Sequence, residues 1–339
     1  MNQAILRRGF LAASMSLAFA GSALAQASDD LVRAAEGKGV VLWYESTPSE
    51  QVAPMIEKFN ERYPNIEVEH VRSTGGTNIA ALVIQESQAR AETASLVTGD
   101  LAIMGQLRDR GLLWEISEGA GINSELVNDG HYVDTAAAVY VIIWNTNNVS
   151  DDERPKAWED FLDPKWEGRV GTWVRSLGFA SLAATYGVEE TKDLVRKFAG
   201  QSPMLYRSTF PLAQQVAAGE IDVAFGLYHT AQPPIQAGAP IQVAGIEPNP
   251  VTTIWSSVVS AGGNPEGGAV FLSWLVSTEG ALAYEDATNR GSARVDGTKT
   301  QALVAGRTLS EWPAEEAAAY AALQAELNTI LEAGGRAAD

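Results

Sequence analysis

Tyr228 and His229 stand side by side in the stretch AFGLYHTAQPP, directly after an apolar run. A phenol oxygen and an imidazole nitrogen can bind iron(III), and both can also hydrogen-bond a small anion. Side chains at neighbouring positions of an extended segment point to opposite faces, so only one of the two is expected to face a given cleft. The chemistry of this pair therefore depends on where the preceding strand, expected at 221–225, delivers it.

Arg175 is a second residue that could act on a ligand, because it is the only basic residue of the segment 172–176. A guanidinium group binds oxyanions such as carboxylates and phosphates through charge-assisted hydrogen bonds. An arginine on a surface loop can equally well be solvated and have no ligand, and the sequence leaves both interpretations open.

The elements that position these residues alternate between strand and helix. Short β-branched and aromatic runs predict strands, and apolar residues three and four apart predict helices. Thr47-Pro48-Ser49-Glu50 has the pattern of a capping box, with Thr47 as the N-cap and a proline at the first helical position. The order βαβα predicts an α/β fold with parallel strands. The expected strands are 40–43, 66–71, 139–144, 170–174, 204–207 and 221–225, and the expected helices begin at 48 and 79 and cover 178–186, 211–218 and 313–334.

The first 25 residues have the pattern of a cleaved secretory leader. Arg7 and Arg8 precede a short apolar stretch, and Ala23-Leu24-Ala25 is a small-residue cleavage site. The two arginines also resemble a twin-arginine signal, from which Leu6 departs, so both export routes stay open. We expect a soluble periplasmic protein that begins at Gln26. The sequence has no cysteine to carry a lipid anchor, a disulfide or a cysteine-based zinc site.

The composition narrows the classes of partner. The chain of 339 residues is 46% hydrophobic, which is enough for one large domain or two lobes. Its formal net charge is −18, and removal of the leader with its two arginines makes it more negative. A surface this acidic repels nucleic acid and anionic lipid, so neither is expected as a partner. The net charge does not choose the ligand, because a local site can oppose the overall field.

Five stretches resemble a known family in the family's own order. They are VVLWYESTPSEQVAPMIEKFNERYPNIEVEHV, LRDRGLL, WEDFLDPKWEGRVG, QQVAAGEIDVAFG and FLSWLVSTEGALAY, and together they cover most of residues 40–285. This order is similar to that of periplasmic solute-binding proteins of ABC importers, in the iron(III)-type branch of the two-lobed (type II) class. Ser95 departs from the pattern, where the family usually has an aspartate.

The resemblance implies two α/β lobes, each a mainly parallel sheet flanked by helices, with a ligand cleft between them. It implies delivery of the ligand to a permease in the inner membrane, and we expect a monomer without a cofactor. The cluster at 245–250 marks a connection between lobes. The lobes are expected at 26–132 plus 246–339, the latter including the closing helix, and at 133–245.

The ligand of an open α/β sheet lies beyond the carboxyl ends of the strands, where loops lead into helices. Five segments qualify, at 44–47, 73–78, 172–176, 208–209 and 228–230. By its match to a liganding tyrosine of the family, Tyr228 is predicted to face the cleft, with His229 packed behind it or facing solvent. The predicted ligand-binding residues are Tyr44, Glu45, Ser46, Ser73, Thr74, Gly75, Thr77, Arg175, Ser208, Thr209 and Tyr228.

The ligand itself has two interpretations. Iron-binding members of the family carry two adjacent tyrosines where this sequence has Tyr228 and His229, so an iron(III) set of Tyr44, Glu45, Tyr228 and His229 would be thinner than usual. Arg175 among serine- and threonine-rich loops favours a small oxyanion, such as a phosphonate, a sugar phosphate or a carboxylate. We therefore predict an anion and keep iron(III) as the alternative.

A secreted hydrolase is a remote third class. The Gly-x-Ser-x-Gly pentapeptide of an α/β-hydrolase does not occur, and three histidines without a cysteine specify neither a triad nor a zinc site. Asp160 and Asp163 form a pair of carboxylates, but they lie in the turn WEDFLDPKWEG that the resemblance explains. The sequence therefore predicts a binding protein rather than an enzyme.

Overall fold

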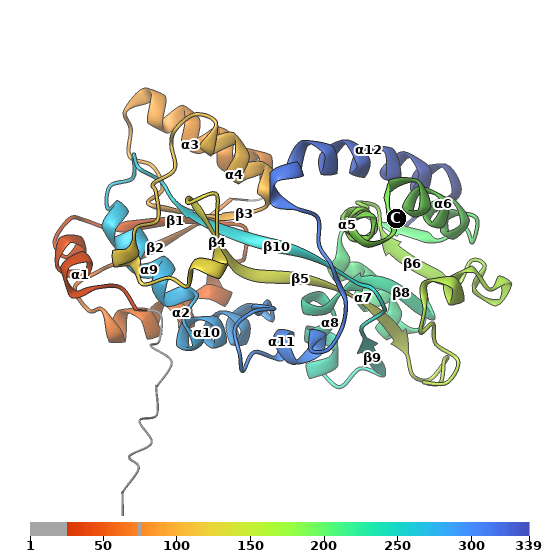
Figure 1. Ribbon diagram of the computed structural model, residues 1–339. Coiled ribbons are helices and arrows are strands. Elements are labelled where there is room, and N and C mark those ends of the chain that lie inside the picture. Colours follow the sequence, from red (N-terminus) through yellow and green to blue (C-terminus); the bar gives the residue numbers. More distant parts are fainter. Residues whose placement is uncertain (1–25, 74–75, 339) are drawn as a thin grey trace, which may run out of the picture.

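Two long strands run through the centre of the molecule and join its two halves (Figure 1). The computed structural model describes residues 26–73 and 76–338, the side chains of 76–78 excepted, so the predicted leader lies outside the described residues. The central strands are β5 (Tyr132–Asn145) and β10 (Asn249–Val258), which pair antiparallel. The main path through the sheet runs in the order β12 (Arg336–Ala337), β7 (Met204–Tyr206), β6 (Val170–Trp173), β8 (Val223–Leu227), β5, β10, β3 (Leu96–Gly99), β1 (Val41–Glu45) and β2 (Val68–Arg72), and three further strands pair beside it.

The first lobe is built on three parallel strands that continue the sheet from β10. These strands are β1 (Val41–Glu45), β2 (Val68–Arg72) and β3 (Leu96–Gly99). An aromatic core that includes Trp43, Phe59 and Phe271 holds some of the helices against them, and a separate apolar cluster that includes Ile79 and Ile103 holds the others. The helices of this lobe are α1 (Asp29–Ala35), α2 (Ser49–Arg62), α3 (Gly76–Ala89), α4 (Leu101–Arg108), α9 (Pro265–Leu275) and α10 (Thr278–Thr288).

The second lobe repeats this arrangement on the other side of β5. Strands β6 (Val170–Trp173), β7 (Met204–Tyr206) and β8 (Val223–Leu227) are parallel, and a second aromatic core includes Trp158, Phe179 and Phe225. Its helices are α5 (Leu177–Tyr186), α6 (Val188–Ala199), α7 (Thr209–Ala218) and α8 (Tyr228–Gln236). Shorter pieces are β4 (Val127–Asn128) and β9 (Ile241–Ala244) on β5, β11 (Leu309–Ser310) on β10, and α11 (Lys299–Val304). The predicted α/β fold with parallel strands in two lobes is confirmed.

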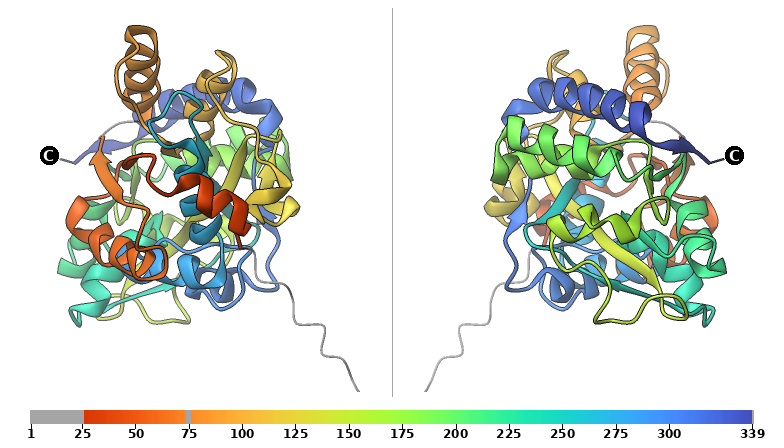
Figure 2. Two further views of the ribbon diagram at one scale, coloured as in Figure 1. Left: turned by 90° about the vertical axis from the view of Figure 1, so that its left-hand side faces the viewer. Right: turned by 90° about the vertical axis from the view of Figure 1, so that its right-hand side faces the viewer.

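The closing helix belongs to the second lobe, whereas the sequence assigned it to the first. Helix α12 (Ala317–Gly334) packs against α5 and α6, and Leu323, Leu327 and Leu331 are buried in the second aromatic core. Both views of Figure 2 show α12 on the same side as α6. After it, β12 (Arg336–Ala337) pairs with β7. The chain at 305–316 therefore crosses from the hinge to the second lobe. Burial of the leucine face of α12 stabilises this arrangement.

Most of the predicted helices and strands lie within a few residues of their predicted bounds. Gly219 ends α7 in the left-handed conformation, with φ of 82°, as its position after the predicted helix required. The predicted capping box is wrong, because the N-cap of α2 is Pro48 and it makes no side-chain cap hydrogen bond. Thr47 turns its hydroxyl to Glu45 instead, with an Oγ1–Oε1 distance of 2.8 Å. No helix among the described residues is long and apolar enough to cross a membrane.

Candidate functional site

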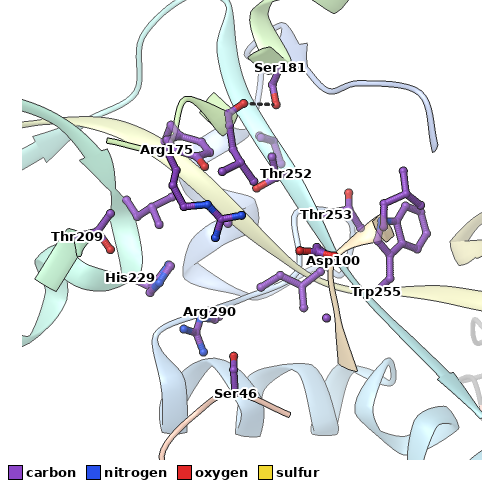
Figure 3. Close-up of a pocket in the computed structure, with 18 of the residues that line it drawn as sticks. Ser46, Asp100, Arg175, Ser181, Thr209, His229, Thr252, Thr253, Trp255 and Arg290 are labelled. Atoms are coloured by element: carbon purple, nitrogen blue, oxygen red, sulfur yellow. Dashed lines mark hydrogen bonds between the residues drawn. The ribbon is translucent and has the colours of Figure 1, made fainter. Parts of the chain in front are cut away.

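A cavity of about 430 Å³ lies between the two lobes, and both contribute to its wall. The first lobe supplies Ser46 after β1 and Asp100 after β3, and the second supplies Arg175 after β6 and Thr209 after β7. These are the carboxyl ends of parallel strands, where helices begin, as the α/β arrangement predicts. Strand β10 adds the floor at 251–255, so Thr252, Thr253 and Trp255 appear beside the loops in Figure 3.

Two guanidinium groups of the second lobe give the cavity a positive side. The Arg175 guanidinium carbon lies 5.1 Å from the centre of the Trp173 ring, which supports it by a cation–π contact. Arg207 lines the same wall, next to Ser208 and Thr209. Neither arginine forms an ion pair with a carboxylate among the side chains that the structure describes, so both are available to an oxyanion.

Arg290 supplies a third guanidinium from the first lobe, and it already has partners. Its Nη1 donates to Thr47 Oγ1 at 2.6 Å and lies 3.9 Å from Glu45 Oε1. The Glu45 side chain is 4% exposed and also accepts hydrogen bonds from the Thr47 backbone N–H and hydroxyl. Burial acts to raise the pKa of Glu45, but the neighbouring His70, Arg290 and Thr47 together lower it below its usual value. This cluster therefore holds a paired, ionised carboxylate at the edge of the cavity.

The other two acidic residues of the wall differ in how they are held. Glu311 Oε2 accepts a hydrogen bond from Arg294 Nη2 at 2.8 Å, so its charge is paired. Asp100 caps helix α4, and its Oδ1 accepts from the Ile103 backbone N–H at 3.1 Å. That bond is to a neutral group and leaves the second carboxylate oxygen, Oδ2, for another partner.

His229 lines the cavity, and Tyr228 does not. The His229 side chain is buried, its Nδ1 has no hydrogen-bond partner among the described residues, and burial together with Arg290 holds its pKa well below the usual value. Tyr228 is half-buried in the hydrophobic cluster around Val139 and Ile221. The predicted orientation of the pair is reversed because Tyr228 is the first residue of α8, so the alternation of the strand no longer applies there.

Five predicted binding residues come together at the cavity, namely Glu45, Ser46, Arg175, Ser208 and Thr209. Tyr44 lies outside it, since its phenol oxygen is 3.2 Å from the Glu86 carboxylate. Ser73 is not in the wall either. Thr74 and Gly75 lie outside the described residues, as does the side chain of Thr77. Ligand contact by these residues stays a prediction, and the structure gives only their positions.

Four charged residues of the wall were not predicted. Asp100 follows β3 in the same way as the predicted loops follow their strands, but β3 was not among the predicted strands. Arg207 directly precedes the predicted Ser208. Arg290 follows helix α10, so it does not lie at the end of a strand. Glu311 follows β11, but a strand of two residues has no recognisable pattern in the sequence.

The chain is similar to solute-binding proteins along most of its length. The family model described as bacterial extracellular solute-binding protein matches residues 54–302. An uncharacterised protein of Haemophilus influenzae is 23% identical over 270 residues, which cover 73% of this chain and 75% of the relative.

The solved structures that are similar carry different ligands. Iron-bound HitA from Pseudomonas aeruginosa has a TM-score of 0.71 at 18% identity, with 85% of this chain and 99% of that one covered. The binding protein AgtB from A. tumefaciens R10, in complex with agropinic acid, has a TM-score of 0.64 at 14% identity, with 87% and 99% covered. At such low identity the likeness gives the fold and leaves the ligand open.

Proposed function

Because the chain belongs to the family of bacterial extracellular solute-binding proteins, we propose that its interlobe cavity captures a small anionic solute for import. A phosphonate, a sugar phosphate or a carboxylate fits this proposal, and a permease of the ABC type in the inner membrane would receive the solute. The observation that carries it is the pair Arg175 and Arg207, which face the cavity without a carboxylate partner among the described side chains. The hydroxyls of Ser208 and Thr209 supply hydrogen bonds beside them.

Because both lobes line the cavity, solute binding can be coupled to closure of the lobes. A solute held by Arg175 of the second lobe and by Ser46 or Arg290 of the first contacts both lobes at once. Contacts that exist only when the lobes are closed shift the population toward the closed form, by the difference in affinity between the two forms. A permease can then distinguish loaded from empty protein by its shape.

Iron(III) is the weaker alternative for this chain. The phenols of Tyr44 and Tyr228 lie in separate hydrophobic clusters, and only Glu45 and His229 of the predicted iron set line the cavity. Burial raises the pKa of Tyr44 to about 12 and also raises that of Tyr228, which opposes formation of the phenolates that a hard cation needs.

Calorimetry with representative anions on purified protein, wild type against Arg175→Ala, tests the proposal. Loss of a hydrogen bond to a charged group weakens binding by about 1.5–3 kcal/mol, which corresponds to roughly 10- to 150-fold. Arg33→Ala is the matched control, because Arg33 lies on α1, 68% exposed and away from the cavity. Equal affinity of wild type and Arg175→Ala, or a visible colour on addition of iron(III) that persists after dialysis, would contradict the anion proposal.

A further inference from the structure

The charges of the cavity wall do not cancel in pairs. Three arginines and three acidic residues line it, namely Arg175, Arg207, Arg290, Glu45, Asp100 and Glu311. Glu45 lies next to Arg290. Glu311 is paired with Arg294, which does not itself line the cavity. Two guanidiniums and one carboxylate, Asp100, remain without an oppositely charged partner among the described side chains.

Asp100 faces the positive side across the cleft. It comes from the first lobe and Arg175 from the second, and Figure 3 shows Arg175 reaching into the cavity from one side with Asp100 on the other. Both side chains line the cavity, so a ligand held in it can lie between the two opposite charges.

A ligand with only negative charge would use half of this wall. It would pair with Arg175 and leave Asp100 negative and without a partner in a cleft that loses water on closing, which costs free energy. A ligand that also carries an ammonium group would pair with both poles. The rest of the wall suits a hydrocarbon segment between the charges, because it includes Ile103, Val251 and Trp255.

We propose that the solute is zwitterionic, with its acidic group at Arg175 and an ammonium group at Asp100. This inference rests on the proposed function, since it names the kind of anion that the cavity selects. The acidic group can be a carboxylate or a phosphonate, because both accept hydrogen bonds from guanidinium in the same way. Asp100 is then the residue that distinguishes an amino acid-like solute from a plain acid.

Two pairs of probes that differ by one amine test the inference by calorimetry. They are 4-aminobutanoate against butanoate, and 2-aminoethylphosphonate against ethylphosphonate. We expect wild-type protein to bind the amine-bearing member of at least one pair about tenfold or more tightly, the effect of one charged hydrogen bond. Asp100→Asn should abolish this preference by weakening the amine-bearing member, and it should bind the plain acid at least as tightly as wild type, because the carboxylate that the plain acid leaves without a partner is gone.

The variant Asp100→Asn should preserve the fold, so that a change in binding can be attributed to the lost charge. The asparagine amide oxygen can still accept from the Ile103 N–H, so the α4 cap survives and the melting temperature without ligand should match wild type. Arg175→Ala is the companion variant and should weaken both members of a pair equally.

The outcomes separate this inference from the function that underlies it. Equal binding of amine and plain acid by wild-type protein, or an amine preference that Asp100→Asn retains, would overturn the zwitterion while the anion site stood. Failure of all four probes to bind wild-type protein at millimolar concentration would count against both. A preference for the amine that disappears in Asp100→Asn, with both members weakened in Arg175→Ala, would support both.

Discussion

Asp134 is a buried carboxylate in the hinge whose protonation should be visible in the stability of the protein. It lies in β5, its side chain is 6% exposed, and its Oδ2 accepts from Arg294 Nε at 2.7 Å. Arg294 continues the chain of contacts to Glu311, and the Thr253 hydroxyl of β10 donates to Glu311 in turn. Asp134 thus ties both crossing strands to the segment that leads to α12.

The sign of the effect follows from the pKa of Asp134. Burial raises this pKa from 3.8 to about 6, against the opposing influence of Arg294, and Glu311 raises it further. Between these two values the folded protein binds more protons than the unfolded chain, so the free energy of unfolding falls as the pH rises through this window. For this one group, the change from pH 5 to pH 7 amounts to a loss of about 1 kcal/mol.

Urea unfolding of wild type and Asp134→Asn at pH 5 and pH 7, followed by tryptophan fluorescence, measures this term. Asparagine does not titrate, so the difference in unfolding free energy between the two proteins should change by about 1 kcal/mol between the two pH values. Asp152→Asn is the matched control, because the Asp152 side chain is 100% exposed, and it should follow wild type at both pH values. Parallel pH dependence of wild type and Asp134→Asn would refute the reasoning.

Two further predictions test the placement of α12 and of the pair at α8. Leu327→Ala should lower the free energy of unfolding by about 2–5 kcal/mol, because Leu327 is fully buried in the second core; a change under about 1 kcal/mol in chemical unfolding would show that α12 is not docked there. His229→Gln should weaken solute binding by about 1 kcal/mol, the net value of one hydrogen bond, while Tyr228→Phe should leave it unchanged in calorimetry; the opposite order would mean that Tyr228 reaches the ligand.

Sequence reasoning predicted residues of the cavity wall where a strand ends and a helix begins. Ser46, Arg175 and Thr209 each follow a strand that its apolar run revealed, and the parallel arrangement brings those strand ends to one cleft. The rule uses only local signals and the order of elements, so it needs no knowledge of side-chain direction.

Side-chain direction is where the same reasoning was wrong. The alternation of the strand was assumed to continue to Tyr228, but the backbone already turns into α8 there. His229, and not Tyr228, therefore lines the cavity. Thr47 failed as a cap for a similar reason, since the buried Glu45 carboxylate takes its hydroxyl. A tertiary partner decides such cases, and no local pattern contains it.

Arg290 and Glu311 could not be found from local patterns at all. Arg290 bonds to Thr47, 243 positions away in the chain, and the Thr253–Glu311 bond spans 58 positions. The sequence neighbours of these residues are loop residues after α10 and β11, which carry no signal of a cleft. Their role becomes visible only after the fold has placed the far end of the chain beside the cavity.

The net charge of the protein repels anions, whereas the arginines of the cavity attract them. Which effect is stronger depends on the distance of the anion from each group of charges. A net charge of −18 repels anions from the surface as a whole, yet a field from exposed charges is screened over about 8 Å at physiological ionic strength. Arg175, Arg207 and Arg290 act at contact distance inside the cavity, where screening is weak. The acidic surface therefore disfavours extended polyanions, which must lie along it, and does not prevent a small solute from pairing with arginines inside the cleft.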